Sequence, residues 1–369
     1  MKGFPTDRWF GRLSLVIVAG YFVVGFWPFD FHPPNRVSWL KNQPGLHFEP
    51  CGIAYDPAPL PTSATQPSAN FTVELRLQAH HEPANNVFNI LTIHNPRQPF
   101  DFTLCQWKQD FLLRATTQPR PRTGKIPEAG VDNALSEGKA QFITVRGDGT
   151  GTDFYVNGLA TEHFPHFVLD AEALDGQLIL GNNASGKNSW TGSLLGLALY
   201  NRALNTAEIA RHNALWMQGH AGQLTNASGL RALYLFDEGR GEQAMDSSEN
   251  RHYVIIPTIF QPVHRAFLIA PWKDLSYYHL DYSDIAMNIL GFMPFGFCFF
   301  LYRRLRKPNQ RIGNVLLVAL TGATVSLTIE IVQAWLPNRV SSVMDLLTNT
   351  TGTLLGVALA LAIQRVVRW

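Results

Sequence analysis

The sequence predicts a mixed fold, in which a bundle of four transmembrane helices carries one inserted all-β sandwich. Four apolar runs lie towards the two ends of the chain, at 13–27, 285–302, 315–335 and 346–367. They are close to the roughly 20 residues that a helix needs to cross a bilayer. The long segment between the first two runs is polar, and it contains stretches of alternating apolar and polar residues, a pattern typical of half-buried strands.

The composition agrees with a membrane protein that carries a water-exposed domain. Charged residues make up 16% of the 369 residues, below the roughly 25% of soluble proteins. The mean hydropathy of -0.03 averages strongly apolar ends and a polar middle. A net charge of +2 gives no reason to expect nucleic acid as a partner. We expect three parts: a first transmembrane helix within 1–35, a sandwich within 36–262 and a three-helix membrane part within 263–369.

The first apolar run is interpreted as an uncleaved span. Lys2, Arg8 and Arg12 precede it, as in a signal peptide, but no small-residue cleavage site follows. Basic residues mark the cytoplasmic side of membrane helices. They gather in the loop after the second run, at 303–311, and at the C-terminus. With four spans, both termini are therefore expected in the cytoplasm, and the middle segment outside.

Polar residues within or beside the last three spans form the candidate binding site. The site consists of Asp284, Asn288, Glu330, Gln333, Arg339, Asp345 and Asn349. The topology predicts that all of them converge at the outer leaflet. Arg339 is expected to fold back over the helix ends and to neutralise at least one of the carboxylates. A charge near the middle of a membrane helix costs about 2.5–3.5 kcal/mol, so such residues usually face a bundle interior or a wet cavity. Two interpretations stay open, a functional pocket and polar contacts that only join helices. For Gly352-x-x-x-Gly356, close helix packing is the preferred interpretation.

The same residues carry a family resemblance. The motif Glu330-x-x-Gln333-x-x-x-Pro337-x-Arg339 precedes Asp345-x-x-x-Asn349-x-x-Gly352-x-x-x-Gly356. Together with Asp284-x-x-x-Asn288-x-x-x-x-x-Pro294-Phe295-Gly296 and Pro28-Phe29-Asp30-Phe31, it resembles the VanZ-like family of bacterial membrane proteins. The resemblance implies a cell-envelope role in the bacterial cytoplasmic membrane, and the family is named for resistance to the glycopeptide antibiotic teicoplanin. It implies no particular reaction.

The middle segment resembles a second family. Strands are expected at 71–77 and 141–146, and turns recur between them, as at Asn157-Gly158. The segment 192–209 is expected to form a strand followed by a helical turn, and 233–239 a closing strand before Asp246-Ser-Ser248. These phrases resemble the laminin-G-like, concanavalin-A-like jelly roll found in lectins, adhesion modules and glucanases. The resemblance implies that the domain binds a carbohydrate or a protein.

The sandwich is not expected to be a hydrolase. Glucanases place two carboxylates about 5–5.5 Å apart at one cleft, whereas the strand 71–77 carries only Glu74. Calcium binding by Asp148, Asp153 and Asp237 is an alternative to a role in turns, and turns are preferred. We predict no cofactor and no metal. Three tryptophans are considered for sugar stacking, with core packing preferred for each: Trp107, Trp190 and Trp216.

Two further predictions concern the cysteines and the segment in which the chain returns to the membrane. Cys51 and Cys105 are the only pair outside the spans that could form a disulfide, because Cys298 lies in an apolar run. The segment 263–283 is rich in Trp and Tyr, as interfacial segments are. Within it, His279 and Asp281 are second-tier site candidates.

Three functions are weighed. The preferred one is a non-catalytic envelope protein that recognises a lipid-linked or cell-wall headgroup, with membrane lipids and a glycan as partners. The alternative is a membrane-embedded enzyme in which Glu330 or Asp345 acts as acid or base and Arg339 holds an anion. A transporter is the third, and the lack of an evident internal repeat counts against it.

Overall fold

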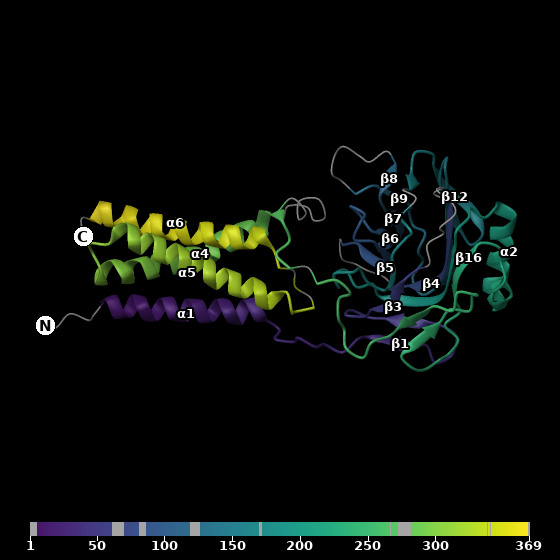
Figure 1. Ribbon diagram of the computed structural model, residues 1–369, viewed down its shortest axis with the longest axis horizontal. Helices are drawn as coiled ribbons and strands as arrows, with labels where there is room; N and C mark the ends of the chain where they lie inside the picture. Colours follow the sequence, from purple (N-terminus) through teal and green to yellow (C-terminus); the bar gives the residue numbers. More distant parts are fainter. Residues whose placement is uncertain are drawn as a thin grey trace. The chain divides into compact units, whose positions relative to one another are not determined.

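The computed structural model divides the chain into two compact units, Met1–Phe31 with Arg265–Trp369, and His32–His264. The residues that it describes are 6–60, 70–80, 86–118, 126–169, 172–265, 267–271, 282–337, 339 and 341–367. The first unit holds the long helices, and the second holds the strands (Figure 1). Each unit is considered by itself.

The described residues of the first unit include four long helices, which lie side by side in Figure 1. They are α1 (Thr6–Phe26), α4 (Tyr282–Arg306), α5 (Arg311–Gln333) and α6 (Val343–Val367). Each is long and apolar enough to cross a membrane, so the prediction of four spans is confirmed. The helices extend beyond most of the predicted apolar runs, because polar and basic residues at their ends continue the helical backbone.

The two ends of this bundle differ, and we name them by their residues. The corner end comprises the last turn of α1, the first turn of α4, the last turn of α5 and the first turn of α6. The basic end comprises the opposite ends of the same helices. Contacts fix this arrangement: Gln333 Nε2 donates to Gly25 O at the corner end, 3.0 Å away, and Arg306 Nε lies 3.2 Å from Asp7 Oδ2 at the basic end.

Helices α4 and α6 pack with their backbones almost in contact. A methyl group placed on Gly352 would overlap Ile289 O, and one on Gly356 would overlap Met293 O, both on α4. On the opposite side of the seam, Gly296 of α4 faces Thr353 O in the same way. Small residues allow such close approach in membrane bundles, where packing supplies much of the helix association. The preferred interpretation of Gly352-x-x-x-Gly356 as a packing motif is therefore confirmed.

The second unit is a sandwich of two sheets with eight strands each among the described residues. Sheet I comprises, in spatial order, β1 (Val37–Trp39), β2 (Leu46–Phe48), β15 (Gly192–Tyr200), β4 (Phe71–Ala79), β10 (Ala140–Asp148), β11 (Gly151–Val156) and β12 (Leu159–Phe164), with β16 (Leu230–Tyr234) also pairing β15. Sheet II comprises β17 (Gln243–Met245), β18 (Tyr253–Ile255), β3 (Ala54–Pro59), β14 (Gln177–Leu180), β5 (Phe88–His94), β6 (Phe102–Trp107), β7 (Asp110–Arg114) and β9 (Glu128–Val131). A small sheet pairs β13 (Val168–Leu169) with β8 (Thr117–Gln118). All pairings of named strands are antiparallel, as the alternation in the sequence predicts.

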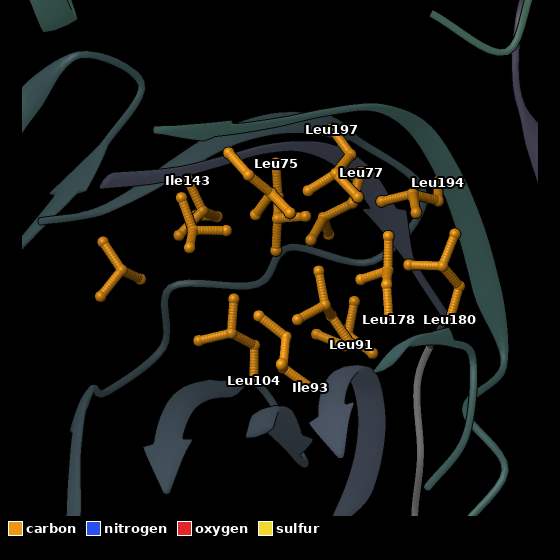
Figure 2. Close-up of a cluster of buried hydrophobic side chains, with 14 of the residues drawn as sticks. Leu75, Leu77, Leu91, Ile93, Leu104, Ile143, Leu178, Leu180, Leu194 and Leu197 are labelled. Carbon is orange, nitrogen blue, oxygen red and sulfur yellow. The ribbon is translucent and has the colours of Figure 1, made fainter. Parts of the chain in front are cut away.

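The core lies between the two sheets, and leucine is its most frequent residue (Figure 2). Sheet I contributes residues such as Leu75, Ile143 and Leu197, and sheet II contributes Leu91 and Leu104. These five side chains are at most 2% exposed. Truncating a buried leucine to alanine typically lowers the free energy of unfolding by about 2–5 kcal/mol, so this layer holds the sheets together.

A helix covers the outer face of sheet I. Helix α2 (Thr206–Met217) packs Ile209 and Trp216 against Phe142, Tyr155 and Tyr200, whose neighbours along the strands point into the core instead. Its N-terminus is a capping box, in which the Asn205 side chain accepts from Glu208 N and the Glu208 side chain accepts from Asn205 N. The predicted helical turn after β15 is thus a full helix, followed by the short 3-10 helix η1 (Ala221–Leu224).

The predicted hairpin at Asn157-Gly158 joins β11 to β12. Both residues have positive φ, 51° and 79°, which a tight two-residue hairpin turn requires. Asparagine and glycine tolerate that region best. The turn chemistry was therefore readable from the sequence.

Candidate functional site

The predicted site residues lie towards the corner end, but they form several separate contacts. Asn288 on α4 donates from Nδ2 to Asp345 Oδ1 on α6, across 2.9 Å. Asn349, one turn further along α6, donates to Ser326 Oγ on α5, across 3.0 Å. These two bonds tie α6 to both neighbouring helices. Interhelical bonds of this kind contribute about 0.6 kcal/mol each on average.

Glu330 is the most deeply buried acid of the set, at 1% exposure. Its Oε2 accepts a hydrogen bond from Ser342 N, 2.8 Å away, at the start of α6. Ser342 Oγ in turn accepts from Met344 N, as an N-terminal cap does. The carboxylate therefore satisfies a backbone donor at a helix N-terminus, where negative charge is favourable.

A short extended segment closes the same corner. Ile269 forms a parallel bridge with Ser342, in which Ile269 N donates to Ser341 O and Val343 N donates to Ile269 O. Arg265, earlier in this segment, stacks its guanidinium over the Trp335 ring at 4.5 Å. The corner between α5 and α6 is thus stabilised by the hydrogen bond of the buried Glu330 and by the contacts of Arg265 and Ile269.

Helix α1 is attached to the corner end by two polar residues of the predicted set. Gln333 Nε2 donates to Gly25 O, as described above. The exposed Arg339 reaches Trp27 O with Nη2 at 3.5 Å, which is the limit of a hydrogen bond. Both contacts use carbonyls at the end of α1, where the helix leaves its last backbone acceptors without partners.

The expected ion pair of Arg339 with a carboxylate is not observed. Among the described residues, Arg339 forms no salt bridge with an acid. The physical reason is that two nearby acids serve other groups, Glu330 the backbone of α6 and Asp345 the amide of Asn288. The expectation that Arg339 neutralises a carboxylate is therefore corrected.

The structure divides the seven predicted residues by access. Glu330 and Asn349 are buried, at 1% and 5% exposure. Asn288, Gln333 and Asp345 are half-buried, and Asp284 and Arg339 are exposed. Asn349 Oδ1 is shielded and has no partner among the described residues. The second-tier candidates His279 and Asp281 lie outside the described residues, as do the interfacial Trp272, Tyr277 and Tyr278.

Sequence reasoning missed the partners of these residues. Ser326 and Ser342 receive or give the bonds of Asn349 and Glu330, yet a serine in or beside an apolar helix is a weak signal. Ser326 does lie four residues before Glu330, on the same face of α5. That spacing is the one sign that could have identified it.

In the sandwich, Glu74 has a structural role. It is fully buried beneath α2, where Oε1 lies 2.7 Å from His212 Nδ1 and Oε2 accepts from Trp216 Nε1 at 3.3 Å. Tyr200 OH points to the same oxygen from 3.5 Å, and burial strongly raises the pKa of this phenol. The cluster fastens α2 to sheet I and presents no acid to a cleft.

The other sequence candidates of the sandwich divide in the same way. Asp148 and Asp153 both bind Arg146, at 2.6 and 3.5 Å. No cluster of three acidic, histidine or cysteine side chains suited to a metal occurs among the described residues. Trp190 and Trp216 are core residues, whereas Trp107 is half-buried with the Lys108 ammonium 4.7 Å from its ring centroid.

No disulfide joins Cys51 and Cys105, which both belong to the described part of the chain. Cys105 is fully buried on β6, its Sγ donates to Asn89 Oδ1, and burial raises the pKa of its thiol to about 12. Cys51 instead sits in a turn, beside Phe260 and Ile53. The suggestion of a bridge is wrong, because both cysteines are free thiols and the Cys105 side chain is bonded to Asn89.

Comparisons with known proteins match each unit to a family. Residues 231–364 match the family described as VanZ/LLP1, and residues 54–210 match that described as Concanavalin A-like lectin/glucanases superfamily. The first match begins in β16 and extends over α4, α5 and α6. A search of the curated proteins found no match.

Solved structures similar to this chain contain lectin-like sandwiches. A SAP-like pentraxin from Limulus polyphemus is 14% identical, with a TM-score of 0.34, over 48% of this chain and 80% of that one. The CBM40 of the Ruminococcus gnavus IT-sialidase is 15% identical, with a TM-score of 0.36, over 46% of this chain and 97% of that one. Both likenesses are remote. The chain is therefore VanZ-like over residues 231–364 and has a domain similar to the concanavalin A-like lectin/glucanase superfamily over residues 54–210.

Proposed function

We propose that this protein is a non-catalytic receptor of the bacterial cell envelope. The corner end of its bundle recognises the anionic headgroup of a lipid-linked or cell-wall precursor, and the sandwich binds a carbohydrate or protein outside the membrane. The observation that carries the proposal is Arg339, an exposed guanidinium at the corner end without an acidic partner among the described residues.

The charge distribution supports an extracytoplasmic corner end. The loop between α4 and α5 and the adjoining helix ends carry Arg303, Arg304, Arg306, Lys307 and Arg311, whereas the turn between α5 and α6 carries only Arg339. Positive charge favours the cytoplasmic side. Exposed tryptophans suit both membrane interfaces, with Trp9 60% exposed at the basic end, and Trp27 63% and Trp335 60% exposed at the corner end. In this topology the sandwich, inserted between α1 and α4, lies outside the cytoplasm.

Arginine is suited to the proposed ligand. Its planar fork can donate two parallel hydrogen bonds to a phosphate or carboxylate, which a lysine cannot do. At a membrane interface, a charged group without a partner favours binding an opposite charge, because neighbouring lipid reduces its hydration. Asp284, which is exposed, and Asp345, which is half-buried, can accept hydrogen bonds from hydroxyl or amide groups of the same headgroup.

The buried members of the predicted site act as its frame. Glu330 positions the start of α6, and Asn349 joins α6 to α5, so both hold the turn that carries Arg339. This division supports a binding role over the alternative of a membrane-embedded enzyme. An acid or base must reach its substrate, and Glu330 is 1% exposed.

In the sandwich, the only acid on β4 is Glu74, which is buried and bonded to His212. A hydrolase needs acids that reach the substrate, so β4 supports binding over hydrolysis. Among the three tryptophans considered for sugar stacking, Trp107 alone keeps part of its ring accessible. It lies at the end of β6, where the next residue, Lys108, turns the chain into β7. We assign Trp107 as the first residue to test for contact with a glycan.

Lipids that co-purify with the full chain test the proposal. The wild-type protein, purified in a mild detergent, should retain a lipid with a phosphate or carboxylate headgroup, identified by extraction and mass spectrometry. Arg339→Ala should lose that lipid, and Arg339→Lys should keep a reduced amount. Arg365→Ala removes one exposed arginine near the opposite end of α6 and should retain it fully. An unchanged lipid set in a folded Arg339→Ala protein would refute the assignment.

A further inference from the structure

The basic end of the bundle carries a strong excess of positive charge. Its described residues include seven arginines and a lysine, namely Arg8, Arg12, Arg303, Arg304, Arg306, Lys307, Arg311 and Arg365, and a single acid, Asp7. Asp7 is already used, since its Oδ2 lies 3.2 Å from Arg306 Nε. The remaining positive charges have no counter-charge among the described residues of this end.

Arg303 differs from the other cations. It lies three residues after Phe300, on the face of α4 that points into the bundle, where Phe300 packs with Val318 and Val357. Its Nε is shielded from solvent and has no hydrogen-bond partner among the described residues. A buried donor without an acceptor is unfavourable, and more so when it is charged, so an acceptor from outside the chain is favoured at this position.

The surroundings of Arg303 are held by local contacts. Lys307 N donates to Arg303 O across 2.8 Å, and Asn314 Nδ2, from the first turns of α5, donates to Lys307 O across 2.9 Å. Asn314 is fully buried. The Arg306 guanidinium stacks on Tyr302, 5.2 Å from its ring centroid. The turn from α4 to α5 is therefore an ordered structure that presents Arg303, Arg304, Lys307 and Arg311 together.

We propose that this cluster binds the phosphate of an anionic phospholipid, with Arg303 as the central donor. The ligand is a lipid because the cluster lies at the end of four helices that are long and apolar enough to span a membrane, and the ends of such helices lie near the headgroups. Basic pockets between transmembrane helices bind anionic headgroups in this way. The site is separate from the corner end, and it does not depend on which side of the membrane the basic end faces.

The test compares lipid retention by the full chain in native mass spectrometry. The protein is exposed to equal amounts of phosphatidylglycerol, which is anionic, and phosphatidylcholine, which has no net charge. The wild type should retain phosphatidylglycerol preferentially. Each basic residue near a membrane surface contributes about 1 kcal/mol of attraction, so Arg303→Ala should weaken the preference about fivefold. Arg303→Lys should restore part of it, because the charge returns without the Nε donor.

Two controls separate this site from the corner end and from general attraction. Arg265→Ala removes one exposed positive charge beside the corner end and should leave phosphatidylglycerol retention unchanged, while Arg303→Ala should leave the co-purifying headgroup lipid unchanged. The two proposals can therefore fail independently. Thermal unfolding reports whether each variant folds. If Arg303→Ala does not fold, Arg311→Ala, at the exposed first residue of α5, replaces it with the same expected direction.

Three results would overturn the proposal. The first is an equal retention of the two lipids by the wild type. The second is a folded Arg303→Ala protein that loses no more of the preference than Arg265→Ala does. The third is displacement of the bound lipid by soluble glycerol phosphate, which would assign the cluster to a free phosphate.

Discussion

At the scale of single residues, the acids of this protein are used mainly to fix backbone and neighbouring side chains. Glu330 accepts from Ser342 N, and in the sandwich Glu74 joins His212 and Trp216 beneath α2. Removing one partner of a buried charged hydrogen bond leaves the other unsatisfied, which typically costs more than the bond itself contributes. Substitution of either glutamate is therefore expected to lower the stability of the fold, although neither carboxylate is expected to react with a substrate.

Glu208 makes a pH prediction possible outside the membrane. The Arg202 guanidinium donates two hydrogen bonds to its carboxylate, at 3.0 and 2.8 Å, and lowers the pKa of Glu208 from 4.5 to about 2. The folded protein thus favours the charged form. Its stabilising effect is complete above about pH 4.5, and it is lost as the pH falls from there towards 2.

We therefore expect Glu208→Gln to weaken α2 at neutral pH and to have little effect near pH 2. Amide hydrogen exchange over 206–217, measured in both proteins as a function of pH and corrected for intrinsic exchange rates, reports this difference. A gap between the two proteins that stays constant down to pH 2 would show that the Arg202 pair does not act through ionisation.

At the scale of elements, the seam between α4 and α6 is the feature on which the corner end depends. Gly352 and Gly356 bring α6 against the backbone of α4, and Asn288 then reaches Asp345 across the seam. Any residue larger than glycine at these positions must move the helices apart. That movement would also separate the two side chains of the candidate site.

The chain contains a matched pair of glycines for testing this. A methyl group on Gly356 would overlap Met293 O, whereas one on Gly291 of α4 meets no atom within 4 Å. Gly356→Ala should lower stability by about 1–3 kcal/mol through overpacking. Gly291→Ala should be neutral or stabilising by up to about 1 kcal/mol, since alanine favours helix. Thermal unfolding in detergent compares them, and equal effects would contradict the close seam.

The elements were more predictable from sequence than their partners. The apolar runs identify four helices, because length and hydrophobicity alone decide whether a segment crosses a membrane. The Asn157-Gly158 hairpin was equally clear, since few residues tolerate its φ values. Helix α2 begins at a capping box and is a full helix, whereas the sequence predicted only a helical turn. The reason is that the apolar pattern of a helix on a sheet face is short and interrupted.

The site was predicted as a set of positions and not as a set of contacts. Spacing on one helix places Glu330 and Gln333 on a common face, but it does not say which neighbour each one meets. Glu330 meets the start of α6, and Gln333 meets the end of α1. The register between helices decides this, and it depends on packing of Gly352 and Gly356 that a single sequence does not fix. The suggested bridge between Cys51 and Cys105 failed for a similar reason, because a single sequence does not fix the distance between two side chains.

At the scale of the whole molecule, a β-sandwich is inserted between two long apolar helices of one unit. Residues 32–264 form the sandwich, and the chain on both sides of it belongs to the same bundle. Insertion after α1 leaves the first helix attached to α5 through Gln333 and to α4 through Tyr21, whose hydroxyl donates to Gly291 O at 2.6 Å. The bundle is therefore complete only when both chain segments are present.

In this arrangement, we expect the corner end to bind an envelope ligand through Arg339. Site-specific photo-crosslinking in living cells tests it most directly. A photoreactive phenylalanine derivative replaces Trp335, exposed at the corner end, or Ile312, 76% exposed at the basic end. The adducts are then identified by mass spectrometry. If Arg339 binds the ligand, an anionic envelope precursor should be attached at position 335, absent at 312 and lost when Arg339→Ala is added. The same adducts at both positions, or an adduct at 335 that persists in Arg339→Ala, would contradict it.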